Sequence, residues 1–261
     1  MSARSYQRIK TEKGGGVLTI TLNYPERRNA IGPVMVNELL YVLEDARIAR
    51  DVTAIVLTGE GKAFCAGGDF AQMTGGADGE ALPHKGDYAD LLLAMVNSDK
   101  PIVAKVNGAA MGGGLGLVAA STFAVASTEA TLGTPEINVG LFPMMIMAVL
   151  QRLVPRRKLV EMMLFGEKLS AEDAHRIGLV NRAVTPGELD GAVVEVVAKL
   201  VGKSPLTTAL GLRAFAAQDD LELEAALPLL RERLGEILAT DDAREGLMAF
   251  LEKRTPKWTG K

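Results

Sequence analysis

The segment at residues 64–70, FCAGGDF, carries a glycine pair at Gly67 and Gly68 directly after an apolar run. A glycine pair lets the backbone turn tightly, so that a main-chain N–H can face a ligand instead of a neighbouring strand. Glycines that follow a strand are more often ordinary turns. Taken alone, this segment leaves both interpretations open.

A second glycine-rich segment, NGAAMGGGLGLVAA at residues 107–120, runs directly into an apolar helical stretch. Glycines at a helix N-terminus leave unpaired N–H groups at the positive end of the helix dipole, where negative charge is favoured. Close packing of the helix on a neighbour would also require glycines. A nucleotide-phosphate loop is disfavoured, because GK[ST] and GxGxxG are both missing.

A single carboxylate, Glu136, lies in the apolar and glycine-containing segment TLGTPEINVGLF at residues 131–142. In such surroundings a carboxylate either caps a helix or has its pKa raised by desolvation, which is what a general base near neutral pH needs. Spacing alone favours the capping role.

The elements that would position these segments alternate between strands and helices. One helix is predicted from Pro33, with Val36, Leu39, Leu40 and Leu43 on one apolar stripe. Another is predicted at about residues 87–96, after a loop at 74–85 without periodicity, and the chain is mainly helical from residue 144. Strands are predicted at residues 17–23, 53–58, 101–106 and 122–127. This order predicts an α/β core with a helical C-terminal part.

Near the C-terminus, the spacing of Asp242 and Glu245 predicts the start of a last helix that runs toward Pro256. Phe250 and Lys253 would lie three residues apart on one face of that helix.

Composition indicates a globular protein without an electrostatic surface for nucleic acid or an anionic membrane. The 261 residues are 48% apolar, and 29 basic residues against 32 acidic ones give a net charge of −3. No run of 18 apolar residues occurs, which disfavours a membrane span. The single Cys65 cannot form an internal disulfide, and the N-terminus lacks the apolar core of a signal peptide, so the cytoplasm is the expected compartment.

Together, the three segments resemble the enoyl-CoA hydratase/isomerase (crotonase) superfamily, with further agreement in PERRNAI, AEDAHRIGLVNRAV and FLEKRTPKW. The resemblance covers nearly the whole chain. It implies an α/β fold, a crotonase-like repeated ββα superhelix over residues 1–200, and a C-terminal helical trimerisation region over residues 201–261. It also implies a homotrimer or a dimer of trimers that acts on an acyl-CoA thioester without a prosthetic group or a metal.

The resemblance also assigns roles to individual residues. The backbone N–H groups of Gly68 and Gly113 would hold the thioester oxygen while it gains negative charge, and Glu136 would be the base. Coenzyme A, as part of the substrate, would be bound by Arg28, Ala30, Ala66, Phe250 and Lys253, the last two reaching it from a neighbouring subunit.

One position departs from the family pattern. Hydratases of this family use two glutamates, and Gly116 stands where the first is expected. A single carboxylate is enough to move a proton from C2 to C4 of a 3-enoyl-CoA, so isomerisation through a dienolate is the leading prediction. The alternatives are a hydratase, dehydratase or decarboxylase with a non-standard second group, and a noncatalytic acyl-CoA-binding subunit. Candidates for that second group are Asp69, Asp78, Glu80, His84 and Asp87.

The remaining side chains near the motifs allow ordinary explanations. Met144, Met145 and Met147 either narrow the acyl end of a pocket or fill the core, the second being favoured. Cys65 is predicted to be a small buried residue and not a nucleophile.

Overall fold

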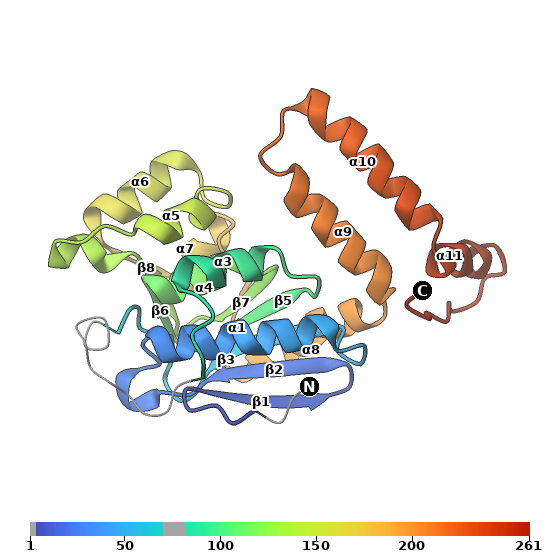
Figure 1. Cartoon of the computed structure of the whole chain (residues 1–261). Coiled ribbons are helices and arrows are strands. Elements are labelled where there is room, and N and C mark those ends of the chain that lie inside the picture. Colours follow the sequence, from blue (N-terminus) through green and yellow to red (C-terminus); the bar gives the residue numbers. More distant parts are fainter. Residues whose placement is uncertain (1–3, 70–81) are drawn as a thin grey trace.

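The computed structural model describes residues 4–69 and 82–261. Its larger sheet has the strand order β1-β2-β3-β5-β7-β10 (Figure 1). β1 and β2 form an antiparallel hairpin, and the strands from β2 to β10 are parallel. The bounds are β1 (Ile9–Gly14), β2 (Val17–Leu22), β3 (Ala54–Gly59), β5 (Ile102–Val106), β7 (Phe123–Ser127) and β10 (Arg182–Val184).

The smaller sheet has the order β4-β6-β8-β9, with β9 antiparallel to β8. Its strands are β4 (Ala63–Cys65), β6 (Ala109–Met111), β8 (Thr131–Gly133) and β9 (Lys168–Ser170). Successive strands of the chain alternate between the two sheets from β3 to β8, and a helix follows each pair. This is the repeated ββα arrangement that the resemblance to the family implies.

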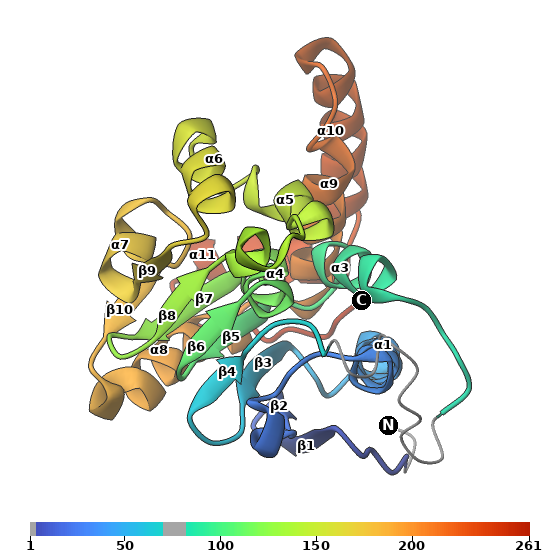
Figure 2. The same cartoon turned by 90° about the vertical axis from the view of Figure 1, so that its left-hand side faces the viewer.

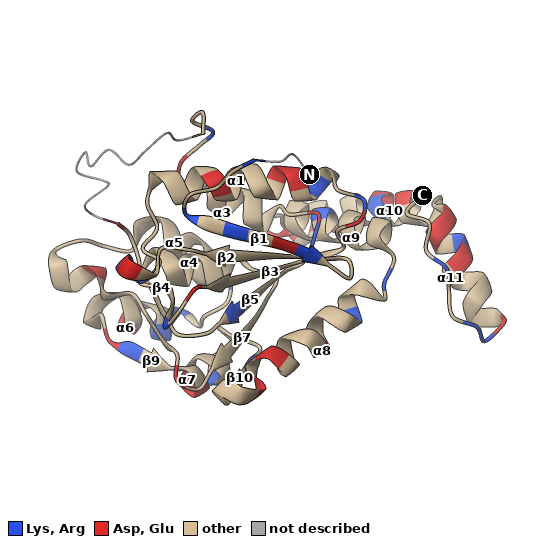
Figure 3. Cartoon of the chain, turned by 90° about the horizontal axis from the view of Figure 1, so that it is seen from below, with Lys and Arg blue, Asp and Glu red and all other residues tan. Residues whose placement is uncertain are grey.

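Helices cover both faces of the larger sheet, as Figure 3 shows with α1 and α3 on one side and α8 on the other. The first of these begins at Pro33, as predicted, and its Val36, Leu39 and Leu40 are buried. The helices of the body are α1 (Pro33–Ile48), α3 (Tyr88–Val96), α4 (Gly113–Ala120), α5 (Met144–Leu150), α6 (Arg156–Phe165), α7 (Ala171–Arg176) and α8 (Leu189–Val201). Short 3-10 turns are η1 (Pro25–Arg27), η2 (Pro135–Val139) and η3 (Pro186–Glu188).

The main hydrophobic core surrounds α4, whose residues from Gly114 to Ala120 are all buried. A second apolar cluster lies under α8, where Leu189 and Val193 pack against Val56, Val103 and Val125 of the larger sheet. Burial of α4 on all sides explains why its sequence has no polar face.

The C-terminal helices α9 (Pro205–Gln218), α10 (Leu223–Leu238) and α11 (Asp241–Leu251) extend away from the body as an arm (Figures 1 and 2). The arm is joined to the body by Arg213, whose Nε and Nη2 donate to the carboxylate of Asp99 at 2.5 and 2.6 Å. The division that we propose between residues 1–200 and 201–261 falls at the end of α8.

The predicted start of the last helix is wrong in detail. Its N-cap is Thr240, whose hydroxyl accepts a hydrogen bond from the N–H of Ala243. Asp242 is buried and instead accepts hydrogen bonds from Ser204 and from the backbone N–H groups of Thr259 and Gly260. The helix ends at Leu251, before Lys253.

None of the helices in the described part of the chain is both long and apolar enough to cross a bilayer.

Candidate active site

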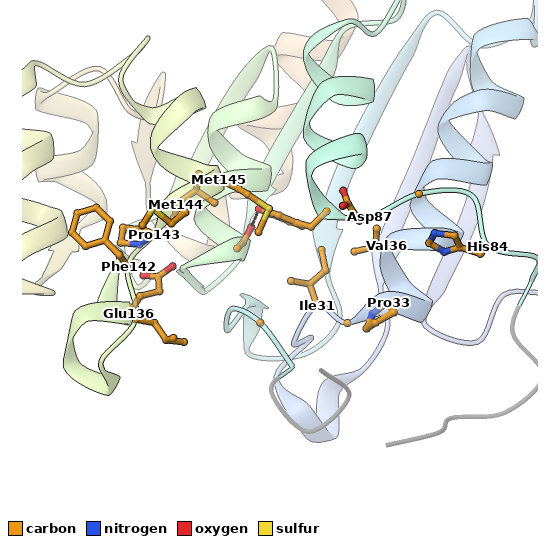
Figure 4. A pocket seen from close by; sticks show the side chains of 17 residues that line it. Ile31, Pro33, Val36, His84, Asp87, Glu136, Phe142, Pro143, Met144 and Met145 are labelled. Atoms are coloured by element: carbon orange, nitrogen blue, oxygen red, sulfur yellow. Dashed lines mark hydrogen bonds between the residues drawn. The ribbon is translucent and has the colours of Figure 1, made fainter. Parts of the chain in front are cut away.

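A cavity of about 590 Å³ opens between α1, α3, α4 and α5, and 17 residues line it (Figure 4). Gly68, Gly113 and Glu136, which come from three different segments, are among them. In Figure 4, Glu136 lies beside Pro143 and Met144, and His84 lies on the far side of the cavity. The rest of the wall is mostly apolar, as expected for a site that holds an acyl chain.

Gly68 is positioned by strand-like pairing with the segment that leads into α1. The N–H of Ile31 donates to the carbonyl of Gly67 at 2.8 Å, and the N–H of Asp69 donates to the carbonyl of Ile31 at 2.9 Å. These two bonds use the carbonyl before Gly68 and the N–H after it. Its own N–H has no acceptor within the described part of the chain, and is therefore available to a ligand.

Gly113 is the first residue of α4, so its N–H has no partner within the helix. The preceding Gly112 has a φ of 49°, in the region that favours glycine, and its N–H donates to the carbonyl of Gly133 at 2.9 Å. A Cβ on Gly114 would lie 2.3 Å from the carbonyl oxygen of Cys65, so α4 packs directly on the segment that carries Gly68. The glycines thus serve both interpretations, close packing and a free N–H.

Glu136 is carried by η2, which is fixed at both ends. The hydroxyl of Thr134 donates to the carbonyl of Met162 at 2.9 Å, and Gly140 closes the turn in the left-handed conformation. Burial raises the pKa of Glu136 above its ordinary value. Its buried Oε2 has no hydrogen-bond partner among residues 4–69 and 82–261. Glu136 does not cap a helix through its side chain, so the capping interpretation is wrong.

The sequence as a whole matches the model of one family, described as enoyl-CoA hydratase/isomerase, over residues 12–261. The chain belongs to the enoyl-CoA hydratase/isomerase family. Crystal structures of family members match the fold: that of an enoyl-CoA hydratase from Mycobacterium smegmatis superposes with a TM-score of 0.88 at 33% identity, covering 97% of this chain and 99% of the other.

Two curated relatives give the same result. One is the enoyl-CoA hydratase domain-containing protein 3, mitochondrial, of Rattus norvegicus, 33% identical over 257 residues that cover 95% of this chain and 83% of the relative. The other is the short-chain-enoyl-CoA hydratase of Clostridium acetobutylicum, 32% identical over 247 residues that cover 93% of this chain and 94% of the relative.

Three of the residues proposed to bind coenzyme A in this family member lie together beside the cavity. The N–H of Ala66 donates to the carbonyl of Arg28 at 3.0 Å, which places the loop of Arg28 and Ala30 next to the segment of Gly68. Asn29 holds this loop: its fully buried amide donates to the carbonyls of Glu60 and Ala63.

Phe250 and Lys253 are not part of the cavity of their own chain. Phe250 belongs to α11, the last helix of the arm (Figure 1), and Lys253 follows that helix; the Phe250 side chain is 81% exposed. Within one chain the structure therefore separates them from the other predicted site residues.

Of the candidates for a second acid or base, only some lie at the cavity. His84 and Asp87 both line the cavity, but Asp87 is the N-cap of α3 and accepts hydrogen bonds from the N–H groups of Ala89 and Asp90. Asp69 is buried next to Gly68. Asp78 and Glu80 lie outside the described residues.

The methionines near the cavity differ in what they contact. Met144 and Met145 line the cavity, whereas Met147 packs against the core. Cys65 is buried, as predicted, and burial raises the pKa of its thiol to about 12, which disfavours a nucleophilic role. No group of three potential metal ligands occurs among residues 4–69 and 82–261.

Tyr88 is a cavity residue that the sequence interpretation missed. It is the first residue of α3, and its hydroxyl donates a hydrogen bond to the carbonyl of Gly113. The sequence feature that could have indicated a close neighbour was Gly116. A glycine inside a buried helix costs about 1 kcal/mol of stability relative to alanine, so its presence indicates that another group approaches the helix closely there.

Proposed function

We propose that this protein catalyses the reversible hydration of an enoyl-CoA thioester through an enolate. The observation that carries the proposal is that Gly68, Gly113 and Glu136 line one mostly apolar cavity, and that the N–H groups of the two glycines have no acceptor among residues 4–69 and 82–261. The names of the relatives from Mycobacterium smegmatis and Clostridium acetobutylicum favour hydration among the reactions of the family.

The chemistry follows from where charge develops. When C3 of a 2-enoyl thioester is attacked, or when a proton leaves C2, negative charge builds on the thioester oxygen. A preorganised N–H aimed at that oxygen lowers the barrier by about 3 kcal/mol. Glu136 would accept and return the proton, and its raised pKa brings the carboxyl nearer to the pH at which it works.

Isomerisation of a 3-enoyl-CoA is the second candidate, favoured by Gly116. The hydratase pattern of the family has a glutamate there, and one carboxylate is enough to remove a proton from C2 and return it at C4. The same two N–H groups would stabilise the dienolate.

Coenzyme A is proposed to contact Arg28, Ala30 and Ala66 from the same chain. Phe250 and Lys253 would reach it from the arm of a neighbouring subunit, in a homotrimer or a dimer of trimers. Residence in the cytoplasm remains a prediction, because the rat relative is named as mitochondrial. Microscopy of the tagged protein in its own cells tests it.

Direct assays separate the candidates. The purified protein is offered crotonyl-CoA, and loss of the conjugated double bond is followed by absorbance; in parallel, 3-hexenoyl-CoA is followed for gain of conjugation. We expect hydration of crotonyl-CoA and its loss by at least about 100-fold in Glu136→Gln. Isomerisation without hydration would select the second candidate. Binding of acyl-CoA without turnover of either compound would mean a noncatalytic subunit.

A further inference from the structure

Position 116 and the Tyr88 side chain compete for the same space. A Cβ on Gly116 would lie 2.2 Å from the hydroxyl oxygen of Tyr88 and 2.5 Å from Cγ2 of Ile146, closer than real Cβ atoms come to other heavy atoms. Glycine at 116 is therefore a condition for Tyr88 to point into the cavity. The site has a hydroxyl group where the side chain of residue 116 would otherwise begin.

The Tyr88 hydroxyl has one proton and two lone pairs, and the proton is already engaged. It is donated to the carbonyl of Gly113, and a Cβ on Gly113 would lie 3.6 Å from the Tyr88 oxygen. The lone pairs remain able to accept a hydrogen bond. Burial, and to a smaller extent the nearby carboxylate of Glu136, raise the pKa of Tyr88 well above its ordinary value, so the phenol is neutral at working pH and is not a base.

Glu136 approaches the same turn of α4. A Cβ on Gly112 would lie 2.8 Å from Oε1 of Glu136, so Tyr88 and Glu136 are next to consecutive residues of the chain. Both side chains line the cavity, and Oε2 of Glu136 is buried without a hydrogen-bond partner in the described part of the protein. An unpartnered buried carboxylate oxygen is costly unless a ligand or a water molecule satisfies it.

We propose that Tyr88 and Glu136 together hold the water molecule that is added to the substrate. The water would donate one hydrogen to the Tyr88 oxygen and the other to the carboxylate of Glu136, leaving a lone pair for C3 of the enoyl-CoA. Tyr88 thereby replaces the carboxylate that is missing at position 116. This inference rests on the proposed enolate chemistry at the same cavity.

The step balances with one carboxylate. The water oxygen forms a bond to C3, and its O–H bond that points to Glu136 breaks as that proton passes to the carboxylate. The electrons of the C2–C3 double bond move to the thioester oxygen between Gly68 and Gly113. Glu136 then gives the proton to C2, and the enolate returns to a thioester. The Tyr88 proton stays on its oxygen throughout, and the net change is the addition of water.

Tyr88→Phe tests the proposal, because it removes the hydroxyl and keeps the ring. Two reactions are compared: hydration of crotonyl-CoA, which needs the water, and exchange of the C2 proton of butyryl-CoA with deuterium, which needs Glu136 and the two N–H groups but no added water. We expect kcat for hydration to fall about 10- to 100-fold, the cost of a misplaced reactant, while exchange changes less than about threefold. The matched control is Tyr41→Phe, which removes a hydroxyl that donates to the carbonyl of Pro83 outside the cavity, and which should leave both rates unchanged.

The outcomes separate this inference from the proposed function. Unchanged hydration in Tyr88→Phe overturns the role of Tyr88. Equal losses in hydration and exchange would mean that Tyr88 only positions Gly113, and also overturn it. If the unmodified protein exchanges the C2 proton but does not hydrate, the water-holding role fails while the enolate chemistry stands; if it does neither, the proposed function itself fails.

Discussion

At the scale of single residues, Glu136 is where function and stability oppose each other. Its carboxylate is partly buried in an apolar wall, and burial raises its pKa. In the folded protein the neutral form is therefore favoured relative to the unfolded chain, so stability from this residue is present at low pH and is lost as pH rises through the folded pKa. Activity needs the opposite, because only the carboxylate can accept a proton.

Glu136→Gln should change both the activity and the stability of the protein, in opposite directions. We expect the rate of the unmodified protein to fall as pH is lowered, with a midpoint above that of an ordinary glutamate, and the variant to lose activity at every pH. The free energy of unfolding of the variant should exceed that of the unmodified protein by roughly 0.5–2 kcal/mol at pH 8, with the difference vanishing near pH 4. Urea denaturation at the two pH values measures this.

The control for that measurement is Glu129→Gln, which changes an exposed glutamate between β7 and β8. It should alter neither the stability nor the pH profile. A Glu136→Gln variant that is less stable than the unmodified protein at pH 8 would contradict a buried, unpartnered carboxylate.

Single-residue features differ in how far the sequence could predict them. Glu136, Gly68 and Gly113 were found because each lies within a recognisable segment. Tyr88 was not, because its contact with Gly116 and Gly113 joins residues far apart in the chain, and nothing local to α3 indicates it. Likewise, Asn29 lies inside the motif PERRNAI, but only the fold shows that its amide joins the loop of Arg28 to the carbonyls of Glu60 and Ala63.

At the scale of elements, the long strands and helices follow from local periodicity. The strands β2, β3, β5 and β7 and the helix α3 lie within one or two residues of their predicted ranges, and α1 begins at the predicted Pro33. The strands of the smaller sheet are three residues each, too short to show a period of two, and were not predicted. Their existence depends on pairing across the ββα turns, which only the tertiary structure provides.

Asn29 connects these elements, since its amide bridges the loop of Arg28 to the turn between β3 and β4. Its side chain donates to Glu60 and Ala63 at 2.9 and 2.8 Å, accepts from the N–H of Tyr24, and its φ is 56°. We expect Asn29→Ala to lower the free energy of unfolding by about 2–4 kcal/mol, from lost buried hydrogen bonds and a left-handed backbone that alanine disfavours.

Denaturation of Asn29→Gly separates the two causes, because glycine tolerates this φ. The glycine variant should be less destabilised than the alanine variant by about 1 kcal/mol. Asn23→Ala is the matched control, since the Asn23 side chain makes no hydrogen bond to any residue that the structure describes, and it should change stability by less than about 0.5 kcal/mol. Equal stability of Asn29→Ala and Asn23→Ala would contradict the bridging role.

At the scale of the whole molecule, charge and apolar surface are distributed differently. Acidic and basic residues are mixed over the body (Figure 3), in agreement with the small net charge. Large apolar side chains of the arm, by contrast, are more than half exposed on α9, α10 and α11: Phe215, Leu223, Leu227, Leu234, Leu238, Leu247, Phe250 and Leu251. Such a surface is typical of an interface. The resemblance to the family implies that it lies between subunits.

We therefore expect light scattering after gel filtration to give three or six times the mass of one chain. The double variant Leu227→Arg and Leu234→Arg places two charges on one stripe of α10, because residues seven apart lie on the same face of a helix. It should dissociate the assembly, since burying unpaired charges in an interface is costly. Loss of the neighbouring arm would also remove Phe250 and Lys253 from coenzyme A, so KM for crotonyl-CoA should rise several-fold in the dissociated protein.

The control is Glu232→Arg, an exposed position on another face of α10, which should keep both the mass and KM. A monomeric unmodified protein would contradict the assembly, and a dissociated variant with an unchanged KM would show that the arm does not reach the coenzyme A bound by a neighbour.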